Sequence, residues 1–310
     1  MKTWKSTKES IWQRKSTWIA AIALLFVAAA TSVPAWAQQD VVKESFSVDE
    51  GGTLYLDIDW GNVEIETGSG ETVRITMERE LRGASDEVLK EALSYHEYYF
   101  GRDGDDVVIE SEYERDDNDR AWRRWREDNN LKITFYVSVP SSYNVDFDSG
   151  AGNVYIDDLD GEIEGRTGAG NITIGDTEGS VDVTSGAGNI TVEGALGDIY
   201  VHSGAGNVIL EDVRGEITAG TGAGNIEATI TRELYGDSSF NTGAGNVTVY
   251  LDENIGADID ARSSLGSARS DYNLRVKGKW LSKSFSGEVN GGGPEIELSA
   301  GVGNVTLRRY

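Results

Sequence analysis

Apolar and polar residues alternate in short runs that recur at a fixed spacing along the second half of the chain. In residues 171–188, Ile172 and Ile174 flank a threonine, and Val181 and Val183 flank an aspartate. Alternation with a period of two among β-branched residues is typical of a strand that buries one face. Each unit of this kind therefore predicts two short strands, joined by turns that contain glycine.

The tetrapeptide Gly-Ala-Gly-Asn marks the boundary between these units. It occurs six times: the first five copies are 18 residues apart, the sixth follows after 21, and the copies end at Asn153, Asn171, Asn189, Asn207, Asn225 and Asn246. A short fixed period indicates stacked copies of one supersecondary unit. Two short strands cannot bury their apolar faces alone, but stacking at the β spacing of about 4.8 Å closes a narrow core between two sheets.

We therefore predict an all-β fold, a parallel β-solenoid of about nine coils, meaning a two-sheet β-helix with 18-residue coils. An antiparallel meander of hairpins is the alternative. The 18-residue identity favours the solenoid, because it places each strand beside its own copy. A short helix over residues 85–95 and a hairpin around residues 101–104 are predicted as an insertion near the N-terminus.

The corner tetrapeptide has a mechanical interpretation. Its glycines permit a positive φ or a close backbone approach, and asparagine can hydrogen-bond to its equivalent one coil away. We predict a structural ladder of the six asparagines together with Asn304 in the last coil, near the C-terminus. The residue before each motif is always serine or threonine, which predicts a second ladder of hydroxyls: Ser149, Thr167, Ser185, Ser203, Thr221 and Thr242.

Binding interpretations of the corner fit less well. A phosphate-binding glycine loop opens a helix, whereas each of these leads into another strand. Calcium-binding β-rolls carry aspartate in the turn, where this chain has asparagine. Calcium binding by the acidic turns stays open.

The N-terminal segment of the chain predicts export. Residues 1–37 have the features of a signal peptide: a basic start, the apolar run Trp18 to Ala30, and Ala35-Trp36-Ala37 before the expected cleavage at Gln38. A retained membrane anchor is the alternative, but the run is short for a bilayer core of about 30 Å. Residues 38–310 are predicted as a single solenoid domain. Within it, 81–130 form the insertion with a charged loop, 131–246 the regular repeats and 247–310 degenerate capping coils.

Composition limits the partners. Without residues 1–37 the chain keeps 23 basic and 52 acidic residues, a net charge near −29, and it contains no cysteine. Such a surface repels nucleic acid and anionic lipid headgroups. We expect neither as a partner, and no stable membrane span after cleavage. The absence of cysteine rules out disulfides, thiolate metal sites and a lipid-anchored lipoprotein.

Two interruptions of the repeat are candidate contact sites for a partner. One is an arginine- and tryptophan-rich stretch, and the other is a net-basic segment over residues 271–287. Arginine beside tryptophan suits cation–π contacts, although packing on the solenoid and charge compensation in a hairpin cap are the alternatives. The candidate residues are Trp122, Arg123, Trp125, Arg126, Lys277, Lys279 and Trp280.

No convergent catalytic set is evident. The two histidines are His96 and His202, and the regular coils carry no protruding loops like those that hold the acids and bases of β-helical pectinases and lyases. We predict no enzyme, no catalytic residues, no bound metal and no cofactor.

The strand at residues 131–140 leads into repeated S/T-G-A-G-N-[IV]-x-[IV] units, and this arrangement resembles the putative-adhesin, β-strand-repeat family of "toast-rack" type from bacterial envelopes. The strand at residues 104–109 and the helix before it are also similar, so the resemblance spans about residues 42–310. Members commonly show Gly-Ser-Gly-Asp where this chain has Gly-Ala-Gly-Asn. The resemblance implies an exported β-solenoid without assigned catalytic residues.

We therefore predict an exported, non-enzymatic structural or interaction protein of the cell envelope, periplasmic or on the cell surface, and adhesin-like. Its expected partner is an envelope protein or a surface glycan. A carbohydrate-binding or glycan-processing module and an envelope-stress signalling component are the alternatives. The partner, handedness and oligomeric state are not encoded in the patterns above.

Overall fold

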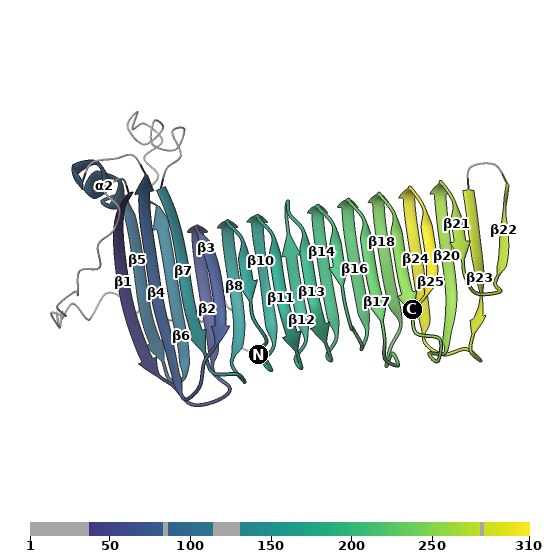
Figure 1. The fold of residues 1–310 in the computed structure, drawn as a ribbon, viewed down its shortest axis with the longest axis horizontal. Helices are drawn as coiled ribbons and strands as arrows, with labels where there is room; N and C mark the ends of the chain where they lie inside the picture. The colour runs from purple at the N-terminus through teal and green to yellow at the C-terminus, as the bar shows by residue number, and fades with distance from the viewer. Residues whose placement is uncertain (1–36, 83–85, 114–130, 280–281) are drawn as a thin grey trace. The chain divides into compact units, whose positions relative to one another are not determined.

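The computed structural model describes residues 37–82, 86–113, 131–279 and 282–310, all within one compact unit, Trp36–Tyr310. The described residues form two sheets, of 12 and 13 strands, which enclose one apolar core (Figure 1). We call the 12-stranded sheet A and the 13-stranded sheet B. The predicted all-β fold with parallel strands in two sheets is confirmed.

Nine coils in the described part of the chain each place one strand in sheet B and the next in sheet A. In chain order the pairs are β2 (Thr53–Trp60) and β3 (Asn62–Thr67), β8 (Asn144–Ala151) and β9 (Val154–Ile156), β10 (Ile163–Ala169) and β11 (Ile172–Thr177), β12 (Val181–Ser185) and β13 (Ile190–Ala195), β14 (Ile199–Ala205) and β15 (Val208–Leu210), β16 (Ile217–Ala223) and β17 (Ile226–Ile230), β18 (Ser238–Ala244) and β19 (Val247–Leu251), β20 (Ala257–Leu265) and β21 (Ala268–Ser270), and β24 (Glu295–Val302) and β25 (Val305–Arg309).

The register follows the sequence period. Ile172 pairs with Ile190, and Val183 with Val201, so equivalent residues of successive coils lie side by side in parallel strands. Every second side chain points inward, and Val183 is completely buried. Full burial of a side chain of this size contributes about 1.5–3 kcal/mol, and each coil repeats that contribution.

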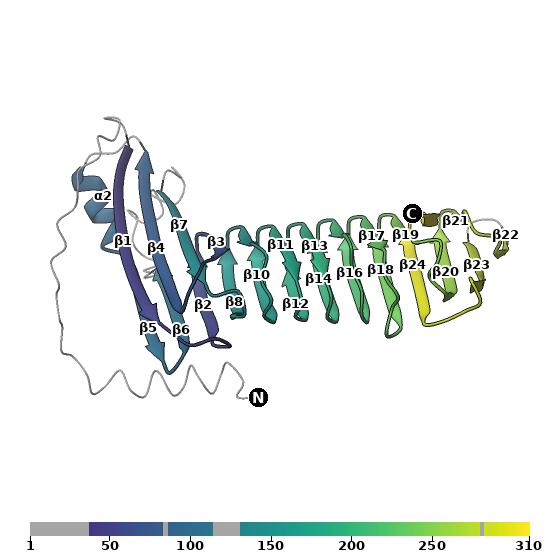
Figure 2. The same cartoon turned by 60° about the horizontal axis from the view of Figure 1, so that its bottom comes forward.

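The spatial order of the coils differs from the chain order at the C-terminal side. Strand β24 pairs with β18 on one side and with β20 on the other, while β25 lies between β19 and β21. In Figure 2 the yellow β24 accordingly stands between the green β18 and β20. The last coil of the sequence is therefore inside the stack. Of the residues 247–310 that were predicted to cap the stack, 295–309 lie inside it, and the coil of β20 and β21 lies outside them.

Antiparallel strands extend both sheets at the N-terminal side. In sheet A, β1 (Ala37–Ser47) pairs with β4 (Thr72–Arg82), which pairs with β7 (Leu131–Val139). In sheet B, β5 (His96–Asp103) and β6 (Asp106–Tyr113) form a hairpin that adds to β2. The helix α2 (Asp86–Leu93) packs its Ala92 against Leu81 beside this end (Figure 2). The predicted helix and hairpin are both present.

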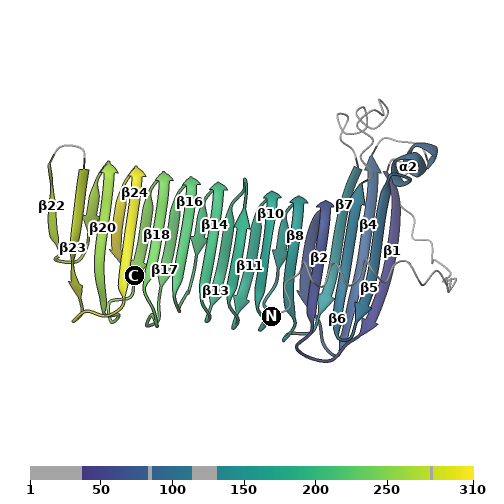
Figure 3. The same ribbon diagram turned by 180° about the vertical axis from the view of Figure 1, so that it is seen from behind.

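At the other end, a second hairpin closes sheet B. Strand β23 (Ser282–Val289) pairs antiparallel with β20, and β22 (Arg275–Lys279) forms the edge (Figure 3). Phe285 of β23 is completely buried, whereas Val276 of β22 is 60% exposed. Val276 is the register partner of Phe285 and lies on the same face, so the buried core ends at β23 and the edge strand β22 extends beyond it.

Candidate functional site

The corner asparagines form a continuous hydrogen-bonded row on the outside of the stack. Each exposed side chain accepts, at Oδ1, the backbone N–H of the next asparagine. The row runs from Asn153 to Asn171, Asn189, Asn207, Asn225, Asn246 and Asn304, with N···O distances of 2.8–3.0 Å. The main chain is a donor in every rung, and in three of them the side-chain Nδ2 of Asn225, Asn246 or Asn304 donates to the same oxygen, at 2.9–3.4 Å.

The row is longer than the repeat indicates. Asn62 Oδ1 accepts the N–H of Asn153 at 3.1 Å, although 91 residues separate them. At the other end, Asn304 Oδ1 accepts both the N–H and the hydroxyl of Ser267, at 3.0 and 2.6 Å. Trp60-Gly61-Asn62 keeps the Gly-Asn pair of the corner, so the sequence carries a signal for the first of these additions. The second depends on the insertion of β24 and β25 into the stack.

The hydroxyl row has a different geometry from the predicted one. The serine or threonine before each motif is buried, and in four of the six copies its hydroxyl donates to a glycine carbonyl one coil away instead of to the next hydroxyl. These four bonds, of 2.7–3.0 Å, are made by Ser185, Ser203, Thr221 and Thr242. Among the described residues, the hydroxyls of Ser149 and Thr167 have no hydrogen-bond partner. The hydroxyls therefore satisfy corner carbonyls from inside, while the asparagines satisfy corner amides from outside.

Gly188, the second glycine of its motif, cannot be replaced by another residue without strain. Its φ is 153°, and a Cβ there would overlap the carbonyl oxygen of Gly170 in the neighbouring coil. A left-handed φ and a close backbone contact both require glycine. The polar groups of the repeated corner are thus engaged in holding coil to coil, which leaves little chemistry there for a ligand.

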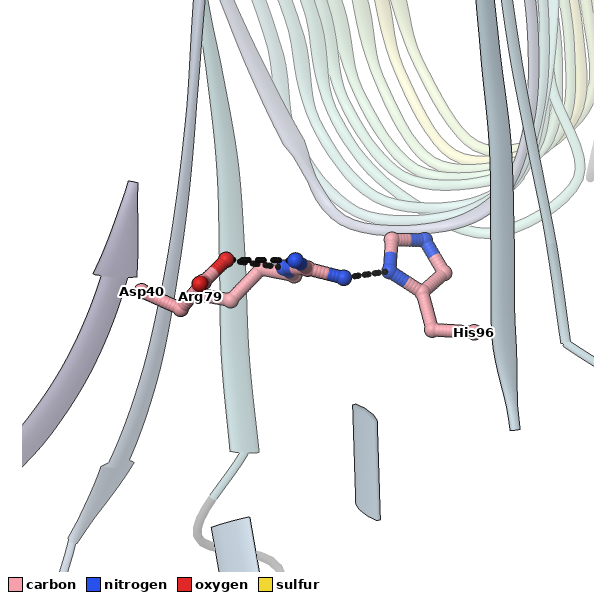
Figure 4. A network of polar contacts seen from close by, with 3 residues as sticks. All are labelled: Asp40, Arg79 and His96. Carbon is pink, nitrogen blue, oxygen red and sulfur yellow. Dashed lines mark hydrogen bonds and ion pairs between the residues drawn. The ribbon is translucent and has the colours of Figure 1, made fainter. Parts of the chain in front are cut away.

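A polar cluster lies between the two sheets at the N-terminal end. Asp40 of β1 forms an ion pair with Arg79 of β4, whose Nη1 lies 3.2 Å from Nδ1 of His96 in β5 (Figure 4). His96 Nε2 lies 2.7 Å from the Ser111 hydroxyl of β6. The Tyr113 ring stacks on the imidazole at 5.0 Å. Arg79 and His96 are both buried, so this cluster ends the apolar core with a polar layer.

The protonation of the cluster follows from its donors. A guanidinium only donates hydrogen bonds, so Nδ1 of His96 must accept and Nε2 must carry the proton. Burial, reinforced by the positive charge of Arg79, lowers the pKa of His96 to about 4. The imidazole therefore stays neutral near pH 7 and donates to Ser111. Because it cannot accept the Ser111 proton in this tautomer, the pair lacks the base that activates a serine nucleophile.

The outer face of sheet B carries carboxylates in register on neighbouring strands. Asp146 of β8 pairs with Glu164 of β10, which pairs with Asp182 of β12. Partial burial, followed by the charges of Glu164 and Asp148, raises the pKa of Asp146 to about 6. Arg166 forms an ion pair with Asp148 on this face. The face is thus acidic over its first coils.

The same face changes character in its middle coils. Across β14, β16 and β18, the outward rows read Tyr200, Thr218 and Ser239, and then His202, Gly220 and Asn241. A depression of about 350 Å³ lies over these strands. The other histidine of the chain is here, and it is exposed, as its outward strand position predicts.

The structure places only part of the predicted contact residues. Trp122, Arg123, Trp125, Arg126 and Trp280 lie outside the described residues. Lys277 is exposed on the edge strand β22, whose last residue is Lys279. Nothing tests these residues as contacts, and they stay predictions.

Metal and membrane features are absent from the part of the chain that the structure describes. Within those residues, no three acidic, histidine or cysteine side chains are grouped so that they could hold a metal ion. No helix in the same ranges has the length and apolar character needed to cross a membrane.

Comparison with known proteins gives a family. The family model described as Toastrack DUF4097 matches residues 53–308. No curated protein matches the chain. Among solved structures, it is similar to a protein from Bacteroides fragilis named a "putative adhesin", at 14% identity and a TM-score of 0.47 over 87% of this chain and 97% of that one.

Two further structures are similar over the same share of this chain. One, also named a "putative adhesin", is from Parabacteroides distasonis, at 11% identity, a TM-score of 0.44 and 97% coverage of that chain. The other, from Clostridium sporogenes, is named a "putative cell adhesion protein", at 14% identity, a TM-score of 0.29 and full coverage. At these identities and scores, the likenesses support no conclusion about what this chain binds.

Proposed function

The chain belongs to the Toastrack family, and we propose that it is an exported, non-enzymatic structural and interaction protein of the bacterial cell envelope. In this proposal the stacked coils form a scaffold, and the outer sheet faces and the end hairpins contact the partner. Adhesion to a surface component is the function that this arrangement serves best.

The observation that carries the proposal is the register of the outward side chains. Parallel pairing of equivalent residues holds one outward row in line across sheet B, from Tyr55 through Asp146, Glu164, Asp182 and Tyr200. Neighbouring strands lie about 4.8 Å apart, so the row is a regular array of contact groups. A preorganised array loses little conformational entropy on binding, which favours affinity.

The chemistry of the described residues supports a role without catalysis. The corner groups are used between coils, and the one cluster that contains a histidine, a serine and an aspartate is buried with its imidazole in the wrong tautomer for a base. A catalytic group must reach a substrate, whereas His96 is 5% exposed.

Export is supported by the sequence pattern alone. The basic start, the apolar run and the small residues before Gln38 are those of a secretory signal. Mass spectrometry of the protein from its native host tests this directly, because the proposal expects an N-terminus at Gln38 in an envelope fraction. An intact N-terminus in the cytoplasm would refute export.

Interaction without turnover can be tested with isolated envelope material. Purified protein should co-sediment with cell-wall and outer-surface preparations and release no reducing sugars or peptides from them. Release of product by the wild type that is lost in His96→Ala or Ser111→Ala, with the fold retained, would overturn the proposal.

The exposed basic residues of the edge strand β22 offer a sharper test of how a partner is bound. Arg275 and Lys277 are exposed and form no ion pair with the described residues. If the end hairpin contacts an acidic partner, Arg275→Ser with Lys277→Ser should weaken co-sedimentation. The matched control is Lys43→Ser with Lys132→Ser, which removes two exposed lysines from sheet A. Equal effects in the two double variants would indicate non-specific charge attraction.

A further inference from the structure

The depression over the middle coils of sheet B is centred on a missing side chain. His202, Gly220 and Asn241 are register partners on three successive strands. With strands about 4.8 Å apart, the two flanking strands β14 and β18 lie roughly 10 Å from each other. The depression of about 350 Å³ between them is lined by side chains of these strands and by the backbone of β16. Its width suits one ring-sized ligand.

The fold does not require a glycine at position 220. Gly220 has no positive φ, and it faces outward, in contrast to Gly165, where a Cβ would overlap the buried Phe147 ring. In the same row, neighbouring coils carry Thr184, His202 and Asn241. Glycine inside a strand weakens the strand and often marks a place where a ligand approaches the backbone.

The side chains around the gap combine a ring face with neutral polar groups. Tyr200 is 47% exposed. Asn241 Nδ2 donates to Ser239 Oγ at 2.5 Å, which fixes the amide and directs its oxygen away from Ser239. His202 leans over the gap, since a Cβ on Gly220 would lie 2.6 Å from its Nδ1. Tyrosine, serine and asparagine supply large contact area and adaptable hydrogen bonds at small entropic cost.

The surrounding charge selects the class of ligand. Asp182 stands beside Tyr200 on one side of the patch, and Glu297 beside Ser239 on the other. The gap itself holds no carboxylate, arginine or lysine. Flanking carboxylates repel an anion, and the polar lining does not suit an apolar chain. A neutral molecule rich in hydroxyls, with one apolar ring face, fits the donors, the acceptors and the tyrosine.

We propose that the gap over Gly220 binds one neutral sugar unit, a hexose or an N-acetylhexosamine, of a surface glycan. The apolar face of the sugar packs on Tyr200, and its hydroxyls bond to Asn241, His202 and Thr218. This inference rests on the proposed interaction function and names the chemistry of the partner.

The test is ligand-observed saturation-transfer NMR on the purified full-length protein. The probes are methyl β-glucoside, methyl β-galactoside and N-acetylglucosamine, with galacturonic acid as the charged control. We expect at least one neutral probe to bind, with the strongest transfer to the protons of one ring face, and no binding of galacturonic acid. Gly220→Thr should weaken binding at least tenfold. Threonine stands at this place as Thr184, so the variant should fold and melt at or above the wild-type temperature.

Two further variants keep the result interpretable. Tyr200→Ala should weaken binding roughly tenfold, whereas Tyr155→Ala, which removes an equally exposed tyrosine from sheet A, should leave it unchanged. No binding of any neutral probe, binding kept in both Gly220→Thr and Tyr200→Ala, or equal binding of galacturonic acid would overturn the sugar site. Co-sedimentation with envelope material without turnover would still support the interaction function in that case, so the two failures can be told apart.

Discussion

The regular coils and the N-terminal end hold themselves together in different ways. In the coils, one small set of bonds is repeated: an asparagine to a backbone N–H outside, a hydroxyl to a glycine carbonyl inside, and alternating aliphatic side chains between. At the N-terminal end, the chain turns antiparallel, and a single group joins four strands: the buried Arg79, His96 and Ser111 with the partly exposed Asp40. The comparison indicates that the stack is held by many weak identical contacts, while its N-terminal end is held by one specific polar group.

The largest expected effect breaks the corner of a regular coil. Gly188→Ala introduces a Cβ against the Gly170 carbonyl and strains a φ of 153°. We expect a loss of roughly 3–4 kcal/mol in the free energy of unfolding. Chemical denaturation measures it. The matched control is Gly70→Ala, which also has a positive φ, 96°, but has open space around it. It should lose roughly 1 kcal/mol. Equal losses would show that close coil contact is not the source.

The polar layer at the N-terminal end contains His96, and it predicts a pH dependence of the free energy of unfolding that the regular coils do not share. The folded pKa of His96, about 4, lies below its ordinary value of 6.5. The unfolded chain therefore binds the proton more readily between these values. Stability from this group is full above pH 6.5 and is lost as the pH falls to about 4, a change of roughly 3 kcal/mol.

His96→Gln should remove this part of the slope. Unfolding curves of the wild type and His96→Gln between pH 4.5 and 7.5 provide the measurement, because the carboxylates common to both cancel in the difference. Parallel pH profiles for the two proteins would contradict the assignment.

One rung of the asparagine row should matter modestly. Asn189→Ala removes the acceptor of the Asn207 N–H, a bond of 2.8 Å, and we expect a loss of about 1 kcal/mol. Asn241→Ala, an exposed asparagine in mid-strand, should stay within about 0.5 kcal/mol of the wild type. Thermal unfolding compares the two. An Asn189→Ala protein as stable as Asn241→Ala would mean that the row is not structural.

The smallest expected effect is a gain on the acidic face. The folded pKa of Asp146, about 6, lies above its ordinary 3.8, so its contribution to stability is present below pH 3.8 and is lost as the pH rises through 6. Asp146→Asn should raise the melting temperature by about 1 °C at pH 8, because exposure to solvent weakens the effect. Near pH 4 the gain should vanish. A gain independent of pH would point to packing and not to charge.

Much of the fold could be predicted from local patterns. The two strands of each coil follow from alternation at Ile172 and Ile174 and at Val181 and Val183, and the corner follows from the glycines. The ladder partners are harder to predict, because the backbone N–H of the next coil is the donor in every rung, while the side-chain amide donates as well in only three of them. The hydroxyls of Ser185 and Ser203 donate to carbonyl oxygens of the corner and not to one another, and the repeated serine or threonine does not reveal that partner.

The end cluster and the depression could not be predicted from the sequence. Asp40, Arg79 and His96 are far apart in the chain and meet only because β1 and β4 continue sheet A while β5 continues sheet B. The gap at Gly220 has no signal of its own among the many glycines of the repeat. Gly220 can be recognised as a gap only from the register of the outward row, in which His202 and Asn241 flank it.

The sequence by itself determined the coil: an 18-residue period, two strands with buried alternate residues, and corners that only glycine allows. These properties depend on contacts between each unit and a copy of itself, so they are written into every repeat. The order of the coils was decided by the tertiary structure alone. In the coil with the corner Gly303-Asn304, the N–H of Asn304 donates to Asn246 and its Oδ1 accepts the next N–H, so this coil extends the asparagine row. In the earlier coil with Gly266-Ser267, the N–H of Ser267 donates to Asn304, and the row of asparagines ends there. Residues 295–309 therefore enter the stack ahead of residues 257–270.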